Sequence, residues 1–188
     1  MKVVIRHLSI ICLLLGWVMS PDKSTEAGQF EFGISVSYYQ SNVADTSQTW
    51  SRRWSANISY TLFSATALEF EFQDVFNQTI VPGFQDTTVQ DRILSLNWVQ
   101  GLVPPDFRVQ PYIKIGVGQL NRDLLATYTT MVAKAQIDSI TAVLTAGLKF
   151  FISRRISITA EATSYLSNGI IDTWKDNLGA NVGVSVIW

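Results

Sequence analysis

Apolar and polar residues alternate one by one along the chain from residue 30 onward. In the stretch FEFGISVSY (30–38), every second residue is aromatic or aliphatic, and the residues between them are polar or small. The same alternation recurs in seven later stretches: 53–62, 68–73, 94–98, 111–118, 142–150, 156–163 and 178–188. A period of two predicts strands that have one apolar face and one polar face. We therefore expect eight strands of about ten residues each, the length with which a tilted strand crosses a membrane.

The segments that join these stretches alternate strictly between short and long. The short ones are Ser64-Ala65, 103–106 and 153–155. The long and polar ones are Gln40 to Thr49, Asn77 to Thr88, Leu120 to Asp138 and Leu166 to Asp176. Short turns and both termini therefore share one end of the predicted structure, as they do in transmembrane barrels. The pattern predicts an all-β fold, an eight-stranded antiparallel up-and-down transmembrane β-barrel.

A soluble eight-stranded barrel with an apolar ligand cavity would show the same alternation. The composition of the two faces favours the membrane-spanning alternative. The polar face consists mostly of Gly, Ser, Thr and Asn, whereas about a quarter or more of a water-facing surface is normally charged. Small residues suit the crowded interior of an eight-stranded barrel. The apolar face carries aromatic residues near the strand ends, as membrane barrels do at both interfaces: Tyr38, Trp54, Tyr60, Trp98, Phe150 and Trp188.

The N-terminus has the pattern of a secretory signal peptide. Lys2 and Arg6 precede an apolar run, and a polar stretch follows it. The apolar run has about a dozen residues, fewer than the roughly 20 that a membrane helix needs. We place cleavage after Ala27, which gives a signal peptide of residues 1–27 and a barrel domain of residues 28–188.

Charge and composition narrow the functional classes. The formal net charge is −1 and 15% of the residues are charged, so the chain lacks the basic excess that a nucleic-acid partner requires. The single cysteine and the single histidine, Cys12 and His7, fall within the predicted signal peptide. The mature chain then lacks the side chains most used for acid–base, nucleophilic and metal-binding roles. We expect no catalysis, no cofactor and no metal, although a Ser–Lys or Asp–Asp arrangement stays open.

Six charged residues of the polar face are expected to point into the lumen, in the half nearer the short turns: Glu31, Glu69, Glu71, Lys114, Lys149 and Glu161. If Pro104-Pro105 centres its turn, Lys114 lies opposite Ser95 and reaches toward Glu71. Buried charges are costly unless they are paired, so these residues would form a salt-bridged plug that fixes the strand register. The alternative is a narrow or gated passage whose selectivity the same charges set.

Apolar residues also lie in the predicted loops, among them Leu124, Tyr128 and Met131 of the longest loop. Binding residues concentrate on loops that a rigid scaffold holds. One interpretation is that the loops pack on one another or that strands extend beyond the membrane as hairpins. The other is a surface patch for a partner protein or a lipophilic ligand.

Two stretches and the last residue resemble a known family. FRVQPYIKIGVGQ (107–119) resembles a strand of the small eight-stranded outer-membrane barrels, the group of outer-membrane proteins A, W and X, and LKFFISRRISITAEATSYLS (148–167) resembles their next hairpin. Trp188 resembles the terminal aromatic residue that the barrel-assembly machinery recognises, although Phe is usual there. The resemblance implies a monomer in the lipid of the outer membrane of a Gram-negative-type bacterium, with a structural or surface-interaction role. The alternative function is passage of small hydrophobic or ionic solutes, which outer-membrane protein W is thought to support.

Overall fold

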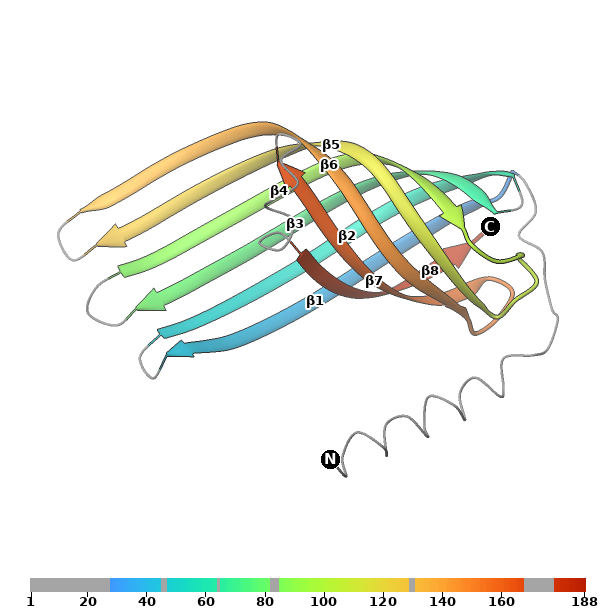
Figure 1. Ribbon diagram of the computed structural model, residues 1–188, viewed down its shortest axis with the longest axis horizontal. Coiled ribbons are helices and arrows are strands. Elements are labelled where there is room, and N and C mark those ends of the chain that lie inside the picture. The colour runs from blue at the N-terminus through green and yellow to red at the C-terminus, as the bar shows by residue number, and fades with distance from the viewer. Residues whose placement is uncertain (1–27, 45–46, 64, 82–84, 129–130, 168–177) are drawn as a thin grey trace, which may run out of the picture.

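Eight antiparallel strands close into a single ring, in the order in which they occur in the chain (Figure 1). This computed structural model describes residues 28–44, 47–63, 65–81, 85–128, 131–167 and 178–188. The strands are β1 (Phe30–Ala44), β2 (Ser47–Phe63), β3 (Thr66–Val81), β4 (Gln85–Gly101), β5 (Val109–Tyr128), β6 (Val132–Phe151), β7 (Ile156–Ser167) and β8 (Leu178–Ile187). The ring confirms the predicted up-and-down barrel. The predicted signal peptide lies outside the described residues, so that boundary stays a prediction. The described residues include no helix that is long and apolar enough to cross a membrane.

The ring closes between the first and the last strand. β1 and β8 pair from Glu31 opposite Ile187 to Val36 opposite Val182. One further bond continues this seam, in which the backbone N–H of Trp188 donates to a β1 carbonyl at 2.8 Å. Closure satisfies the backbone groups that an open sheet would leave unpaired at its edges.

Side chains alternate between the outside of the ring and its interior, as the period of two predicts. Ile115 and Val117 on β5 point outward and are 57% and 63% exposed. The inward residues are mostly polar or small, and several of them, such as Ser55, Thr145 and Ser157, are almost fully buried. The barrel is therefore apolar outside and polar inside, the reverse of a soluble protein and the arrangement of a membrane barrel.

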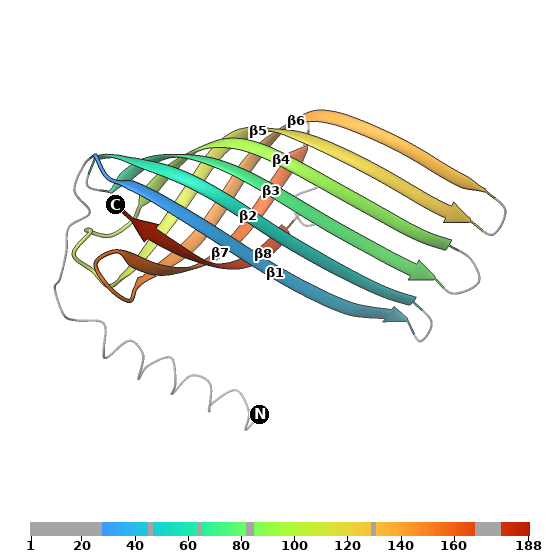
Figure 2. The same ribbon diagram turned by 180° about the vertical axis from the view of Figure 1, so that it is seen from behind.

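The apolar surface forms a band that ends at a definite position on the strands. Outward residues change from apolar to polar between Phe72 and Asp74 on β3, and between Val117 and Gln119 on β5. Strands β1 to β6 continue past this position and project beyond the barrel as one curved sheet, which we call the extension (Figure 2).

Most residues of the predicted long loops belong instead to strands. β5 and β6 have 20 residues each, about twice the expected length. The predicted loop from Leu120 to Asp138 is thus largely a β-hairpin, and so are the predicted loops 40–49 and 77–88. Beyond the apolar band both faces of a strand can be polar, so alternation stops marking the strand while backbone pairing continues. The predicted fourth loop, Leu166 to Asp176, falls largely outside the described residues.

The short connections lie together at the opposite end from the extension, as predicted (Figure 1). Ser64-Ala65 joins β2 to β3, residues 152–155 join β6 to β7, and residues 102–108 join β4 to β5. This end carries the C-terminus as well.

The β4–β5 connection changes the expected register. Lys114 lies opposite Val99 and not opposite Ser95, so the expectation that Pro104-Pro105 centres this turn is wrong. The two prolines, which have no N–H for a strand ladder, occupy the first half of the turn. Gln110, at the start of β5, holds the turn against this strand. Its side-chain amide donates a hydrogen bond of 2.6 Å to the Pro105 carbonyl.

Candidate functional site

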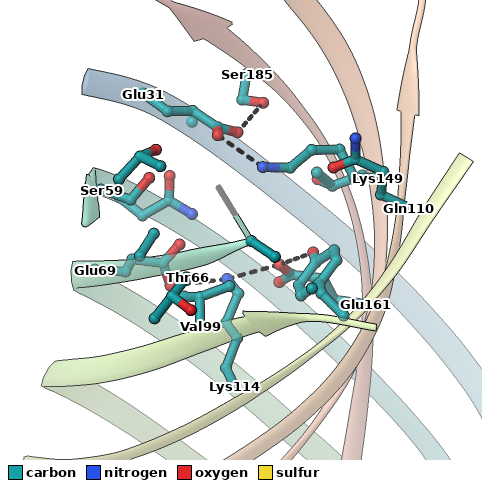
Figure 3. A pocket seen from close by; sticks show the side chains of 18 of the residues that line it. Glu31, Ser59, Thr66, Glu69, Val99, Gln110, Lys114, Lys149, Glu161 and Ser185 are labelled. Carbon is teal, nitrogen blue, oxygen red and sulfur yellow. Dashed lines mark hydrogen bonds and ion pairs between the residues drawn. The ribbon is translucent and has the colours of Figure 1, made fainter. Parts of the chain in front are cut away.

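The lumen near the short connections holds a group of charged side chains (Figure 3). The structure places all six sequence-predicted residues there: Glu31 on β1, Glu69 and Glu71 on β3, Lys114 on β5, Lys149 on β6 and Glu161 on β7. We call these six residues the lumen charge cluster. All of them except Glu71 line a small cavity of about 70 Å³. Inward residues of paired strands lie side by side, which brings together positions far apart in the sequence.

Lys114 lies at the centre of the lumen charge cluster and is 2% exposed. Its Nζ lies 2.8 Å from Oε1 of Glu69 and 2.7 Å from Oε1 of Glu161. Because Lys114 lies opposite Val99 and not opposite Ser95, its ion pairs are with Glu69 and Glu161 and not with Glu71. Asn97 reaches Glu71 instead, and its Nδ2 donates to Oε2 of Glu71 at 3.2 Å and to Oε1 of Glu69 at 3.3 Å. The buried ammonium of Lys114 is therefore paired with two carboxylates, and a buried charge without a partner would be strongly destabilising.

Another ion pair joins β6 to β1. The Nζ of Lys149 lies 2.7 Å from Oε2 of Glu31. The other carboxylate oxygen of Glu31 accepts a hydrogen bond of 2.6 Å from Ser185 on β8, and the Ser185 hydroxyl lies 2.6 Å from that of Ser157 on β7. This network crosses the β1–β8 seam, so it ties the closing strands together from inside.

Tyr112 reaches Glu161 across an intervening strand. Gly147 on β6 lies opposite Tyr112 on one side and opposite Glu161 on the other. The Tyr112 ring occupies the space where a side chain at Gly147 would stand, and its hydroxyl donates to Oε1 of Glu161. Neutral donors such as Tyr112 and Asn97 thus supplement the two lysines, which face four carboxyl groups.

An apolar layer lies above the lumen charge cluster, on the side of the extension. Ile93, Leu120, Val143 and Tyr165 are buried and contact one another. Beyond this layer a larger cavity of about 660 Å³ opens in the lumen. Charged, apolar and hollow parts of the lumen therefore follow one another along the barrel.

A further ion pair, Arg122 with Asp91, lines the larger cavity. The Nε and Nη2 of Arg122 donate to Oδ1 and Oδ2 of Asp91, both at 2.7 Å. The sequence pattern did not predict this pair, because Arg122 falls in a predicted loop and Asp91 precedes the predicted strand 94–98. Continuing the alternation beyond the apolar band would have found both residues, which lie directly opposite each other on β5 and β4. Arg53, also inward, lines the same cavity and was not singled out from the sequence.

The charged side chains of the lumen charge cluster are arranged to pair with one another. Among the residues that the structure describes, no group of three or more His, Cys, Asp or Glu side chains is placed to hold a metal ion. Ion pairs and hydrogen bonds engage the carboxylates of Glu31, Glu69, Glu71 and Glu161. The geometry suits a filled lumen that holds strands in register.

Comparison with solved structures identifies the architecture. Neither a known protein family nor a curated protein matches the sequence. The N-terminal β-barrel domain of OprF from Pseudomonas aeruginosa superposes with a TM-score of 0.59 at 14% sequence identity, over 86% of this chain and 98% of that domain. The chain has the fold of the small eight-stranded outer-membrane barrels.

Two further outer-membrane barrels share this fold. Ail, the attachment invasion locus protein of Yersinia pestis, matches with a TM-score of 0.56 at 12% identity, over 86% of this chain and 99% of Ail. Neisserial surface protein A matches with a TM-score of 0.50 at 14% identity, over 85% of this chain and 97% of that protein. The predicted fold class, a transmembrane eight-stranded barrel, is confirmed by these likenesses together with the closed ring.

Proposed function

We propose that this chain is a non-enzymatic outer-membrane protein with a closed lumen, whose extension serves interactions outside the cell. In this proposal the apolar band lies in outer-membrane lipid of a Gram-negative-type bacterium and the chain is a monomer. Trp188 is the residue that the barrel-assembly machinery reads during insertion. The lumen charge cluster is the plug that fills the barrel.

The ion pairs of Lys114, which cross the lumen, are the observation that supports the proposal most directly. Lys114 bridges Glu69 on β3 and Glu161 on β7, and so crosses the interior of the ring. An ion that passed this point would have to displace a buried ammonium from two carboxylates, which costs several kcal/mol. The apolar layer above it is a second barrier, because an ion there would lose its hydration.

The extension supports a role in surface interaction. Its β5–β6 hairpin carries exposed apolar side chains, including Met131, Val132 and Ile137. Exposed apolar patches mark sites for a partner protein or a lipophilic ligand. Ail has been solved in complex with the heparin analogue sucrose octasulfate, at 13% identity and a TM-score of 0.52. From that complex we take over the general role of ligand binding by a small barrel.

Passage of small solutes is the second candidate function. Gln73 and Asn181 are buried in the lumen, and their side-chain amides have no hydrogen-bond partner among the described residues. Gln73 lies two positions beyond Glu71 on β3, and Asn181 lies opposite Glu161 on β8. These unsatisfied amides favour a narrow polar passage for solutes through the lumen, beside the apolar layer.

Planar-bilayer recording of the refolded mature protein separates the two functions. We expect no single-channel steps from the wild type or from Lys114→Met, because methionine still fills the volume of the lysine. Lys134→Met, on the outward face of the extension, is the matched control. Steps in the wild type whose ion selectivity changes with Lys114→Met, and not with Lys134→Met, would establish the passage instead of the plug.

A further inference from the structure

The cavity of about 660 Å³ at the outward end of the lumen has a wall that is partly polar and partly apolar. Its size falls in the range of sites that hold small organic molecules. The part formed by β2 and β3 carries mostly polar residues, Thr49, Ser51, Arg53 and Asn77, together with Val75. The part formed by β4 and β5 carries Val89, Ile93 and Leu120 together with the paired Asp91 and Arg122. We call this space the outer cavity.

Arg53 is buried in the wall of the outer cavity without an ionic partner among the described residues. It is 9% exposed, and its Nη1 donates no hydrogen bond to a described residue. No ion pair of the described part of the chain includes it. Its guanidinium lies 5.7 Å from the ring centroid of Tyr165 and against Gly179, where any side chain would collide with it. A buried guanidinium is costly unless an anion and hydrogen-bond acceptors compensate it.

The other charges of the outer cavity leave Arg53 uncompensated. Asp91, the described carboxylate in the cavity wall, is held by both nitrogens of the Arg122 fork at 2.7 Å. This pair is neutral as a unit. The described wall therefore has a net charge of one positive unit, which belongs to Arg53.

We propose that the outer cavity binds a small organic anion that enters from the side of the extension. Its carboxylate, phosphate or sulfate group binds the guanidinium of Arg53, whose planar fork matches these oxyanions. Ser51 and Asn77 offer hydrogen bonds beside it, and the apolar body of the ligand packs on Val89 and Leu120. The proposal goes beyond surface interaction and holds whether or not the lumen conducts.

The anion comes from the aqueous phase, not from a lipid headgroup. Arg53 points into the closed ring, whereas its neighbour Arg52 points outward, where its guanidinium lies 5.9 Å from the ring centroid of Phe76. A headgroup beside Arg52 lies on the outer face of β2 and is separated from Arg53 by that strand. This alternation gives a matched pair of variants: Arg53→Gln and Arg52→Gln each remove one positive charge from β2, on opposite faces.

Isothermal titration calorimetry of the mature protein, refolded in a neutral maltoside detergent, tests the site. The probes are benzoate and phenyl phosphate, with benzamide as the uncharged counterpart of benzoate. We expect both anions to bind the wild type about tenfold or more tightly than benzamide, the effect of one charge-assisted contact. Arg53→Gln should abolish this preference, Arg53→Lys should keep part of it, and Arg52→Gln should leave it unchanged.

Three results would overturn the proposal: no binding at millimolar anion, equal binding of benzoate and benzamide, or equal losses in Arg53→Gln and Arg52→Gln. Adding lipopolysaccharide to the micelles distinguishes the two sources of an oxyanion. If lipopolysaccharide competes with benzoate on the wild type, a lipid phosphate is the ligand and the aqueous source is wrong. If Arg53→Gln does not refold, a competition experiment on the wild type takes the place of that variant. Phenyl phosphate is titrated in the presence of inorganic phosphate, and absence of competition between them counts against an anion site.

Discussion

Lys114 shows how one side chain can decide the state of the lumen. Its ammonium is the group that separates the carboxylates of Glu69 and Glu161, with Nζ–O distances of 2.8 and 2.7 Å. Without it, two negative charges would face each other in a space that is largely closed to water. Breaking a buried pair by removal of one partner is far more costly than the pair itself is stabilising.

We expect Lys114→Met to lower the free energy of unfolding by about 3–5 kcal/mol. The measurement is a urea unfolding titration of the protein in phospholipid vesicles. Lys149→Met is the matched control: the Lys149 side chain is 20% exposed and has one carboxylate partner, so its loss should be clearly smaller. Equal stability of the wild type and Lys114→Met would show that the lumen charge cluster does not hold the barrel together.

At this scale the sequence predicted which way the side chains point but not what they touch. Alternation placed Lys114 and its carboxylates in the lumen. Which residues lie next to Lys114 depends on the register of β4 and β5, and the composition of the turn between them does not reveal where that turn is centred. Gly116 shows the same limit. From the sequence alone, Gly116→Ser points into the lumen and should be tolerated better than a charge on the lipid side at Ile115. In the structure a side chain at Gly116 would collide with Asn97 and with the Leu96 carbonyl, so Gly116→Ser is expected to destabilise the barrel.

Strands β1 to β6 each consist of a part within the apolar band and a part beyond it. On β6 the outward residues run through Leu144 to Ile140 before the first charge, Asp138, and the strand then continues to Val132. All eight strands and three short turns were predictable, because a lipid-facing strand must alternate. The far ends were not, because a polar strand in water is constrained only by its backbone pairing.

The same substitution at two heights on the outer surface should have two different effects. Ile115→Arg puts a charge near the middle of the apolar band and should cost about 2–4 kcal/mol, whereas Ile140→Arg, at the outward limit of the band, should cost about 0–1 kcal/mol. Both residues point outward, and Ile140 is 76% exposed. Refolding titrations into vesicles measure both. If Ile140→Arg is the more damaging change, the apolar band has been placed at the wrong height.

The whole molecule is asymmetric along its axis. One end carries the short connections and the C-terminus, and the other carries the extension of β1 to β6 (Figure 1). This asymmetry was predictable from the alternation of connection lengths. The outer cavity was not predictable, because it needs the closed ring, the apolar layer beneath it and the inward Arg53 at once.

The orientation of the barrel in the membrane follows from this asymmetry. A chain that inserts from the periplasm keeps its short connections there and sends the longer hairpins outward. A peptide tag inserted between β3 and β4, at residues 82–84, should therefore bind antibody on intact cells, and a tag at Ser153 should bind only after the cells are opened. The opposite labelling pattern would invert the barrel.

The seam between β1 and β8 has a consequence for the order of folding. Its ladder runs only from Glu31 to Val36 on β1, whereas β5 and β6 pair from Val109 to Thr127. It also joins the two strands most distant in the chain, so closing it costs more loop entropy than any hairpin does. We therefore expect the hairpins to form first and the seam last, and the ring to open at the same seam when the protein unfolds. Two contacts of Glu31 would then form only once all eight strands are in place. They are the hydrogen bond from Ser185 and the ion pair with Lys149, and they hold the closed seam together.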